Sequence, residues 1–188
     1  MSSEIRISGG FLKGESINVL RKGSYRITME QARKSLFDTL GDKVSNSIFM
    51  DLFAGSGIVG IEALSYGAEK VVFVEKYPLA IMMIRKNLKK LSLEEKTEVF
   101  CQDVFMFLRK NPVYKFDIIF ADPPYDIEKN INNIVKYVSD NFWLKENGIL
   151  IIEHHKKTVL EESFEDLKLV HEKRIGETSF SYFSYKGE

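Results

Sequence analysis

The sequence predicts an α/β fold in which a mainly parallel sheet of seven strands is covered by helices on both faces. From about residue 47, short apolar runs alternate with longer segments of helical spacing, the pattern of successive βαβ units. The apolar runs are nearly continuous, as expected of strands that are buried on both faces. After residue 153 two segments resemble antiparallel strands, which predicts a C-terminal hairpin.

Individual elements follow from the same patterns. The expected strands of the main sheet cover residues 47–53, 71–75, 97–102, 116–121, 148–153, 166–175 and 178–185. The expected helices cover residues 28–40, 58–66, 79–91, 104–110 and 129–141. Thr28 with Gln31 forms a weak capping box for the first helix, and the glycine-punctuated segment before it predicts a small β-hairpin. We therefore expect an N-terminal arm over residues 1–45, packed on a main domain over residues 46–188.

Composition limits where a nucleic acid could bind. The 188 residues include 27 Lys and Arg and 27 Asp and Glu, so the neutral chain as a whole does not attract anionic partners. Residues 1–34 hold seven of these cations against three glutamates, which is either a local nucleic-acid patch or ordinary solvated surface. The candidate contacts in this patch are Arg6, Lys13, Arg21, Lys22, Arg26 and Arg33.

Several classes of protein are disfavoured. A single cysteine, Cys101, allows no internal disulfide and suits a reducing compartment. The N-terminus lacks the apolar core of a signal peptide, and no apolar run reaches the roughly 18 residues of a membrane span, so we expect a soluble, cytoplasmic protein. The three histidines show no ligand spacing with Cys101 or a carboxylate cluster, so no metal site is expected.

A glycine loop follows the first strand of the main sheet. Gly55, Gly57 and Gly60 form G-x-G-x-x-G at the start of a helix, and Glu75 ends the next strand. Glycine allows close approach of the backbone to a ligand, and a carboxylate at that position can accept both ribose hydroxyls. The loop therefore predicts a nucleoside-containing cofactor. On this motif alone, a nicotinamide or flavin oxidoreductase and a plain glycine turn both stay open.

Carboxylates at neighbouring strand ends extend the prediction, because ligands of parallel sheets bind at the carboxyl ends of the strands. Asp51, Glu75 and Asp103 should line one crevice. Asp103 is placed to accept from the amine of an adenine, to cap the helix that follows, or both. The candidate cofactor contacts are Thr28, Asp51, Phe53, Ala54, Gly55, Ser56, Gly57, Glu75, Lys76, Asp103 and Val104.

The stretch Ala121 to Asp126, "ADPPYD", ends the fourth strand of the main sheet and so faces the same crevice. A carboxylate, two prolines and an aromatic residue in succession are rare enough to make an ordinary turn an unsatisfying explanation. The turn therefore marks a second part of one site.

The two motifs together resemble the class I S-adenosylmethionine-dependent methyltransferases that act on exocyclic amines of nucleobases. Further segments are similar to the bacterial RsmD-type enzymes, and the likeness spans about residues 5 to 153. These segments are residues 9–14, 26–28, Arg33, 35–40, 51–68 and 117–125. The chain departs from the family's usual sequence at Lys13, where Arg is common, and at Ile27, where Pro is usual.

The resemblance implies a Rossmann-like fold and S-adenosylmethionine as cofactor. The sequence has no signal for oligomeric state, and a monomer is the default expectation. The resemblance also implies methylation of the N2 amine of guanine 966 of 16S rRNA, within an assembling or assembled 30S particle. Asp122 and the Pro123 carbonyl would accept the hydrogens of the amine and direct its lone pair at the methyl group. Pro124 would fix the turn and Tyr125 would stack on a flipped base, without a metal.

Other functions remain open. An adenine-N6 methyltransferase would use the same four residues, 122 to 125. A nicotinamide oxidoreductase would explain the glycine loop and Glu75 but not this turn, and a catalytically idle RNA-binding protein would leave both motifs without a purpose.

Overall fold

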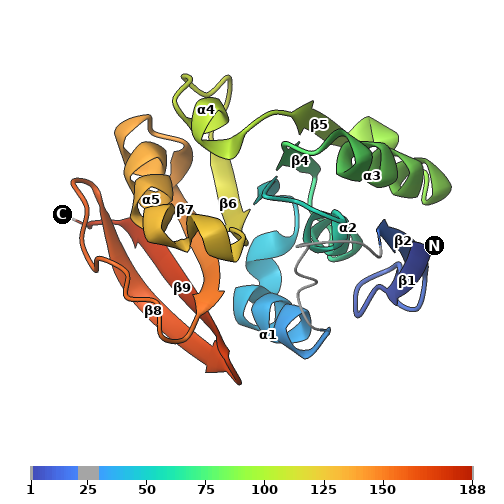
Figure 1. Cartoon of the computed structure of the whole chain (residues 1–188), viewed down its shortest axis with the longest axis horizontal. Coiled ribbons are helices and arrows are strands. Elements are labelled where there is room, and N and C mark those ends of the chain that lie inside the picture. Colours follow the sequence, from blue (N-terminus) through green and yellow to red (C-terminus); the bar gives the residue numbers. More distant parts are fainter. Residues whose placement is uncertain (1, 21–29, 188) are drawn as a thin grey trace.

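A computed structural model describes residues 2–20 and 30–187 and confirms the predicted fold class. In the described residues the main sheet has seven strands in the order β5-β4-β3-β6-β7-β9-β8 (Figure 1). The strands are β3 (Ile48–Leu52), β4 (Lys70–Glu75), β5 (Thr97–Cys101), β6 (Phe116–Ala121), β7 (Leu144–His155), β8 (Leu167–Ile175) and β9 (Thr178–Tyr185). Strands β3 to β7 are parallel, and β9 pairs antiparallel with both β7 and β8, which closes the sheet with the expected hairpin.

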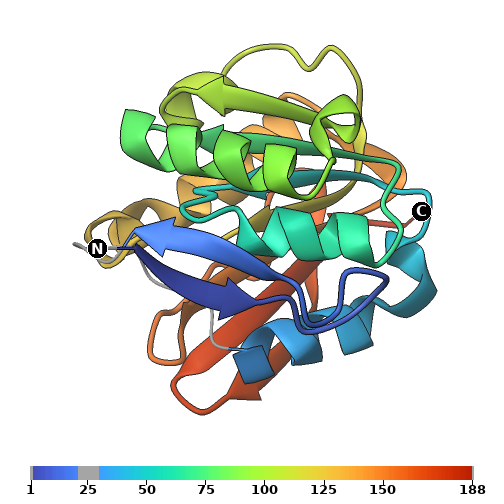
Figure 2. The same cartoon turned by 90° about the vertical axis from the view of Figure 1, so that its right-hand side faces the viewer.

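Helices cover both faces of this sheet (Figures 1 and 2). They are α1 (Glu30–Leu40), α2 (Ile58–Ser65), α3 (Pro78–Lys90), α4 (Val104–Leu108) and α5 (Ile131–Asp140), with the 3-10 helices η1 (Gly41–Val44), η2 (Glu94–Lys96) and η3 (Tyr125–Asn130). One buried apolar cluster contains side chains of α1, α2 and α3, and a second contains side chains of α4 and α5. Alternate residues of the central strands feed the two clusters, which explains their continuous apolar sequence.

The N-terminal hairpin forms a separate two-stranded sheet of β1 (Ser2–Arg6) and β2 (Ser16–Leu20). It packs on α3 through two hydrogen bonds between the Asn18 backbone and the Asn87 side chain. Asn18 N donates to Asn87 Oδ1 at 3.0 Å, and Asn87 Nδ2 donates to Asn18 O at 2.9 Å. The side chains of Ile17 and Val19 are buried in the same apolar cluster as α1 to α3. The hairpin therefore shares the core of the rest of the molecule.

Several boundaries differ from expectation, among them the starts of β7 and α5. Strand β7 begins at Leu144 rather than at residue 148, because its pairing with β6 shifts register between Phe116 and Ile118. Gly148 lies in this irregularity, where a Cβ atom would approach Phe116 O to 2.8 Å. Helix α5 begins at residue 131 because η3 occupies the positions before it. In the part of the chain that the structure covers, no helix combines the length and apolarity needed to cross a membrane.

Candidate active site

The two motifs lie side by side because the strands that carry them are neighbours. In the parallel pair β3 and β6, Leu52 is opposite Ala121. Both strands end there, so the glycine loop and the turn at Asp122 begin next to each other. The backbone N–H of Asp122 donates to Leu52 O at 3.5 Å across this junction. The next strand after β3 is β4, and the next strand after β6 is β7, so the chain leaves β3 and β6 toward opposite edges of the sheet. The junction between β3 and β6 is therefore the topological switch point, where open parallel sheets bind ligands.

The glycine loop has three residues in the left-handed region. Gly55 and Gly57 have φ of 53° and 76°, and Phe53 has φ of 58°, which is uncommon for a residue with a side chain. The turn is closed by Gly57 N, which donates to Ala54 O at 2.7 Å. Backbone strain at a residue such as Phe53 persists only where the surroundings impose it, and it is concentrated at ligand sites.

Gly60 has a different task from the other two glycines. A Cβ atom at this position would lie 2.3 Å from Cε1 of Phe73, on strand β4 beneath the helix. Helix α2 can therefore pack this close to the sheet only with glycine at position 60. The third glycine of the motif serves helix packing and does not face a ligand.

The Glu75 carboxylate joins two loops at the ends of β3 and β4. Its Oε2 accepts from Gly55 N at 2.9 Å and its Oε1 accepts from Tyr77 N at 3.0 Å. The side chain is buried, so these two donors hold it in one orientation. Each carboxylate oxygen has a further lone pair, so Glu75 can still accept hydrogen bonds from two ribose hydroxyls, the role that the sequence predicts for it.

Asp103 caps α4, one of the two roles expected for it. Its Oδ1 accepts from Phe105 N at 2.9 Å and from Met106 N at 3.1 Å. Both bonds end on one oxygen, so among the described residues Oδ2 has no donor. The side chain is half-buried at the end of β5, where Oδ2 is available to an amine. Val104, the next residue, is buried against the sheet.

Asp51 is the most deeply buried of the three carboxylates predicted to line the crevice. Its side chain is buried beneath the glycine loop, where Oδ2 accepts from Gly60 N at 2.9 Å. The pKa of Asp51 is raised to about 8, chiefly by burial and to a lesser extent by the Glu75 carboxylate, while the hydrogen bond from Gly60 N lowers it. Asp51 thus supports the loop from below.

The turn after β6, residues 122–125, is called the acceptor turn, and its residues differ in how far they are exposed to solvent. Asp122 is half-buried and Pro123 is buried, whereas the Tyr125 side chain is 63% exposed. The Pro124 carbonyl accepts from Ile127 N at 2.9 Å at the start of η3. No described residue donates to the Pro123 carbonyl, which leaves this oxygen available for an amine hydrogen.

The remaining candidates for cofactor contact differ in how far they are buried. Ser56 is half-buried and its Oγ accepts from Ile58 N at 3.4 Å, while Ala54 is buried. Lys76 is exposed, with its Nζ 5.0 Å from the centre of the Tyr77 ring. In residues 2–20 and 30–187, no group of three His, Cys, Asp or Glu side chains is arranged to hold a metal ion. The candidates outside the described residues are Arg21, Lys22, Arg26 and Thr28.

Of the three described candidates for nucleic-acid contact, Arg6 and Lys13 are exposed, but Arg33 is not. Arg33 is 1% exposed, its Nε lies 3.2 Å from Oε1 of the fully buried Glu62, and its Nη2 donates to Arg6 O at 3.1 Å. Glu62 also accepts from Ser8 N at 2.7 Å. Arg33 therefore ties α1 to α2 and to the hairpin, and the prediction that it contacts nucleic acid is wrong.

The sequence analysis did not identify Glu62 and Ser65, two residues of α2 that form hydrogen bonds with the segment after β1, residues 8–12. Ser65 Oγ donates to Gly9 O at 2.6 Å and accepts from Leu12 N at 2.9 Å. The available signal was the position of Glu62, a carboxylate in the otherwise apolar helix "IVGIEAL". A charged residue on a buried helix needs a partner, and the arm supplies it.

Comparison with known proteins gives the family. Residues 5–184 match the family described as "Conserved hypothetical protein 95". The chain is 31% identical over 185 residues, 97% of this chain and all of the relative, to "Putative rRNA methyltransferase YlbH" of Bacillus subtilis. It is 35% identical to "Ribosomal RNA small subunit methyltransferase D" of Buchnera aphidicola, over 83% of this chain and 81% of the relative.

Among solved structures, one titled "Putative methyltransferase yhhF from Escherichia coli" superposes with a TM-score of 0.87 at 25% identity, over 99% of this chain and all of the other. The match extends from the N-terminal hairpin to the C-terminal one. The chain therefore belongs to the RsmD family, the family of the ribosomal RNA small subunit methyltransferases D.

Proposed function

We propose that this protein transfers a methyl group from S-adenosylmethionine to the exocyclic N2 amine of a guanine in small-subunit ribosomal RNA, with guanine 966 of 16S rRNA as the expected target. The protein is an S-adenosylmethionine-dependent RNA methyltransferase. The single observation that carries the proposal is the adjacency of β3 and β6, which puts a nucleoside site and an amine-acceptor turn at one edge of the sheet.

The residues of the first loop fit the cofactor. Glu75 presents a fixed carboxylate for the ribose hydroxyls, and Asp103 Oδ2 can accept from an adenine amine. The glycines leave room for the amino-acid portion close to the backbone. When bound, the cofactor supplies an electrophilic methyl group on a sulfonium.

The turn at Asp122 supplies what the amine needs. A guanine N2 lone pair is delocalised into the ring, so its nucleophilicity rises when acceptors draw its hydrogens out of the ring plane. Asp122 and the Pro123 carbonyl are the two acceptors, and they also stabilise the positive charge that develops on nitrogen. Most of the acceleration comes from holding the two reactants in line.

The exposed ring of Tyr125 provides a platform for a base that has left its stack. Base stacking on such a ring is worth about 1–3 kcal/mol. The exposed cations Arg6 and Lys13 on the N-terminal arm, residues 1–45, would hold the RNA backbone while the main domain, residues 46–188, performs the transfer. We expect a cytoplasmic monomer that acts on an assembling or assembled small-subunit particle.

An Asp122→Ala variant tests the assignment of the acceptor. It should lose methyl transfer to small-subunit particles that lack the modification, while its affinity for S-adenosylmethionine stays within about twofold of wild type. Asp140→Ala, at the far end of α5, is the matched control and should keep both. Equal loss of cofactor binding in the Asp122 variant contradicts the role given to this residue.

A second assay separates the alternative class. A nicotinamide oxidoreductase would bind NAD(P)H in the glycine loop, whereas the proposed enzyme binds S-adenosylmethionine and not NAD(P)H. Calorimetry with each cofactor distinguishes the two.

A further inference from the structure

The charges of this protein are segregated along the chain. Residues 76–93 contain five Lys and Arg but no Asp or Glu, and residues 1–34 contain seven against three. Together these segments hold an excess of nine cations, which the rest of the neutral chain balances with nine excess acidic residues. A neutral protein with this distribution can still present one strongly positive face.

The fold joins the two basic segments. Strand β2 packs along α3, with Lys90 Nζ donating to Ser16 O at 2.7 Å and Asn87 bonded to Asn18 (Figure 2). Strand β2 and helix α3 run in opposite directions, because Ser16 is bonded to Lys90 and the later residue Asn18 to the earlier residue Asn87. Strand β2 therefore runs toward the first turn of α3. That turn begins at Pro78, three residues after Glu75, at the edge of the sheet that carries the candidate active site.

Four cations on the second half of α3, Arg85, Lys86, Lys89 and Lys90, are exposed. Among the described residues none of them is in an ion pair, and the Lys86 and Lys89 ammonium groups make no hydrogen bond. Cations in the last turn of a helix complement its dipole, which accounts for Lys89 and Lys90. It does not account for Arg85 and Lys86, which lie a turn earlier.

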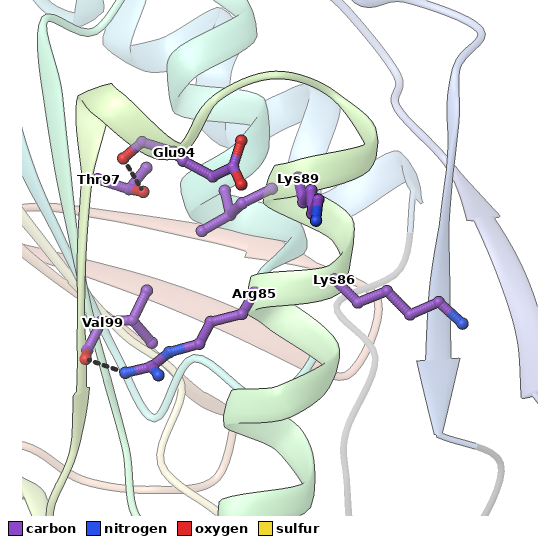
Figure 3. Close-up of a pocket in the computed structure, with 7 residues that line it drawn as sticks. Arg85, Lys86, Lys89, Glu94, Thr97 and Val99 are labelled. Atoms are coloured by element: carbon purple, nitrogen blue, oxygen red, sulfur yellow. Dashed lines mark hydrogen bonds between the residues drawn. The ribbon is translucent and has the colours of Figure 1, made fainter.

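A pocket of about 550 Å³ lies between this part of α3 and strand β5 (Figure 3). Leu88 and Val99 contribute apolar side chains to it, and Arg85 reaches across to Val99 O with Nη2 at 3.5 Å. Glu94 also lines the pocket, near Thr97 at the start of β5. The lining carries three cations, Arg85, Lys86 and Lys89, against the one carboxylate of Glu94, so its net charge favours an anion such as a phosphate group.

We propose that the outer face of α3, with its pocket against β5, contacts phosphate groups of the RNA substrate as a continuation of the N-terminal arm. The inference rests on the proposed function, since it assumes an RNA substrate. Helix α3 has 13 residues and is about 20 Å long, so RNA flanking the target base can follow it away from the site. The partner is RNA backbone because the surface offers positive charge without base-reading geometry.

The test uses Lys86→Gln/Lys89→Gln, since neither side chain supports the fold. Lys43→Gln/Lys168→Gln is the control, because it makes the same change in net charge at two exposed lysines that lie on η1 and β8 and outside the proposed surface. Binding of a protein-free small-subunit rRNA fragment is measured at several salt concentrations, beside binding of S-adenosylmethionine.

We expect the α3 variant to lose about tenfold in RNA affinity near 0.15 M salt, with the slope of log K against log salt smaller in magnitude by about 1.4, because each phosphate contact contributes about 0.7 for single strands. The control should lose less than twofold, and cofactor affinity should stay unchanged in both. An unchanged slope in the α3 variant, or an equal change in the control, overturns the inference. A loss seen with intact particles but not with free RNA also overturns it, since the surface would then contact ribosomal protein. If wild type binds neither the free RNA nor the small-subunit particle, the proposed function itself fails, whatever the role of α3.

Discussion

The buried pair of Arg33 and Glu62 gives the sharpest test of how the arm is attached. In an Arg33→Met variant the Glu62 carboxylate stays fully buried and, among the residues that the structure describes, keeps only Ser8 N as donor, at 2.7 Å. Removal of one partner from a buried ion pair costs about 3–5 kcal/mol, and the retained Ser8 bond places the expected loss near the lower end, about 3 kcal/mol. For a domain of this size that lowers Tm by about 6–12 °C.

Urea unfolding followed by circular dichroism measures the loss, and the double variant Arg33→Met/Glu62→Leu provides the comparison. Replacement of both charges removes the stranded carboxylate, so we expect the double variant to recover at least half of the lost free energy of unfolding. If Arg33→Met unfolds within about 0.5 kcal/mol of wild type, below the usual cost of a broken buried pair, and instead loses RNA affinity, Arg33 is a nucleic-acid contact and the buried pair has no structural role.

Three further predictions concern the glycine loop. Glu75→Ala should weaken S-adenosylmethionine binding at least tenfold by calorimetry, because the ribose acceptor and the anchor of Gly55 N are both lost; a change below threefold contradicts this role. Asp51→Asn removes a group whose pKa is raised from 3.8 to about 8, so its contribution to wild-type stability is complete below pH 3.8 and is lost as pH rises toward 8. The wild-type free energy of unfolding should therefore fall relative to Asp51→Asn by up to about 1.4 kcal/mol per pH unit in that interval, and parallel pH profiles would refute the shift. Gly60→Ala should cost about 1–3 kcal/mol, since its Cβ would lie 2.3 Å from Phe73 Cε1, and an unchanged urea midpoint contradicts the close packing.

Much of the fold could be read from the sequence because it depends on local patterns. The strands from β3 to β6 are apolar runs that burial on both faces requires, and their observed bounds lie within a residue or two of expectation. The start of β7 was missed because "KENG" has the composition of a turn, whereas the structure accommodates it as an irregularity against Phe116.

The burial of Arg33 depends on a contact that is distant in the chain. Its partner Glu62 lies 29 residues later, and only the packing of α1 on α2 brings the two together. A count of charges treats every arginine of a basic segment alike, so it could not separate Arg33 from the exposed Arg6. The burial of Asp51 has a related cause: strand position identified its end of the sheet but not the donor, Gly60 N, that holds its side chain beneath the loop.

The central claim is tested most directly by labelled methyl transfer to small-subunit particles that lack the modification, followed by mapping of the labelled nucleotide. The account predicts a single labelled guanine carrying the methyl on N2, and no label with Asp122→Ala. Label on the N6 amine of an adenine would contradict the account, because the same acceptor turn would then serve a different base.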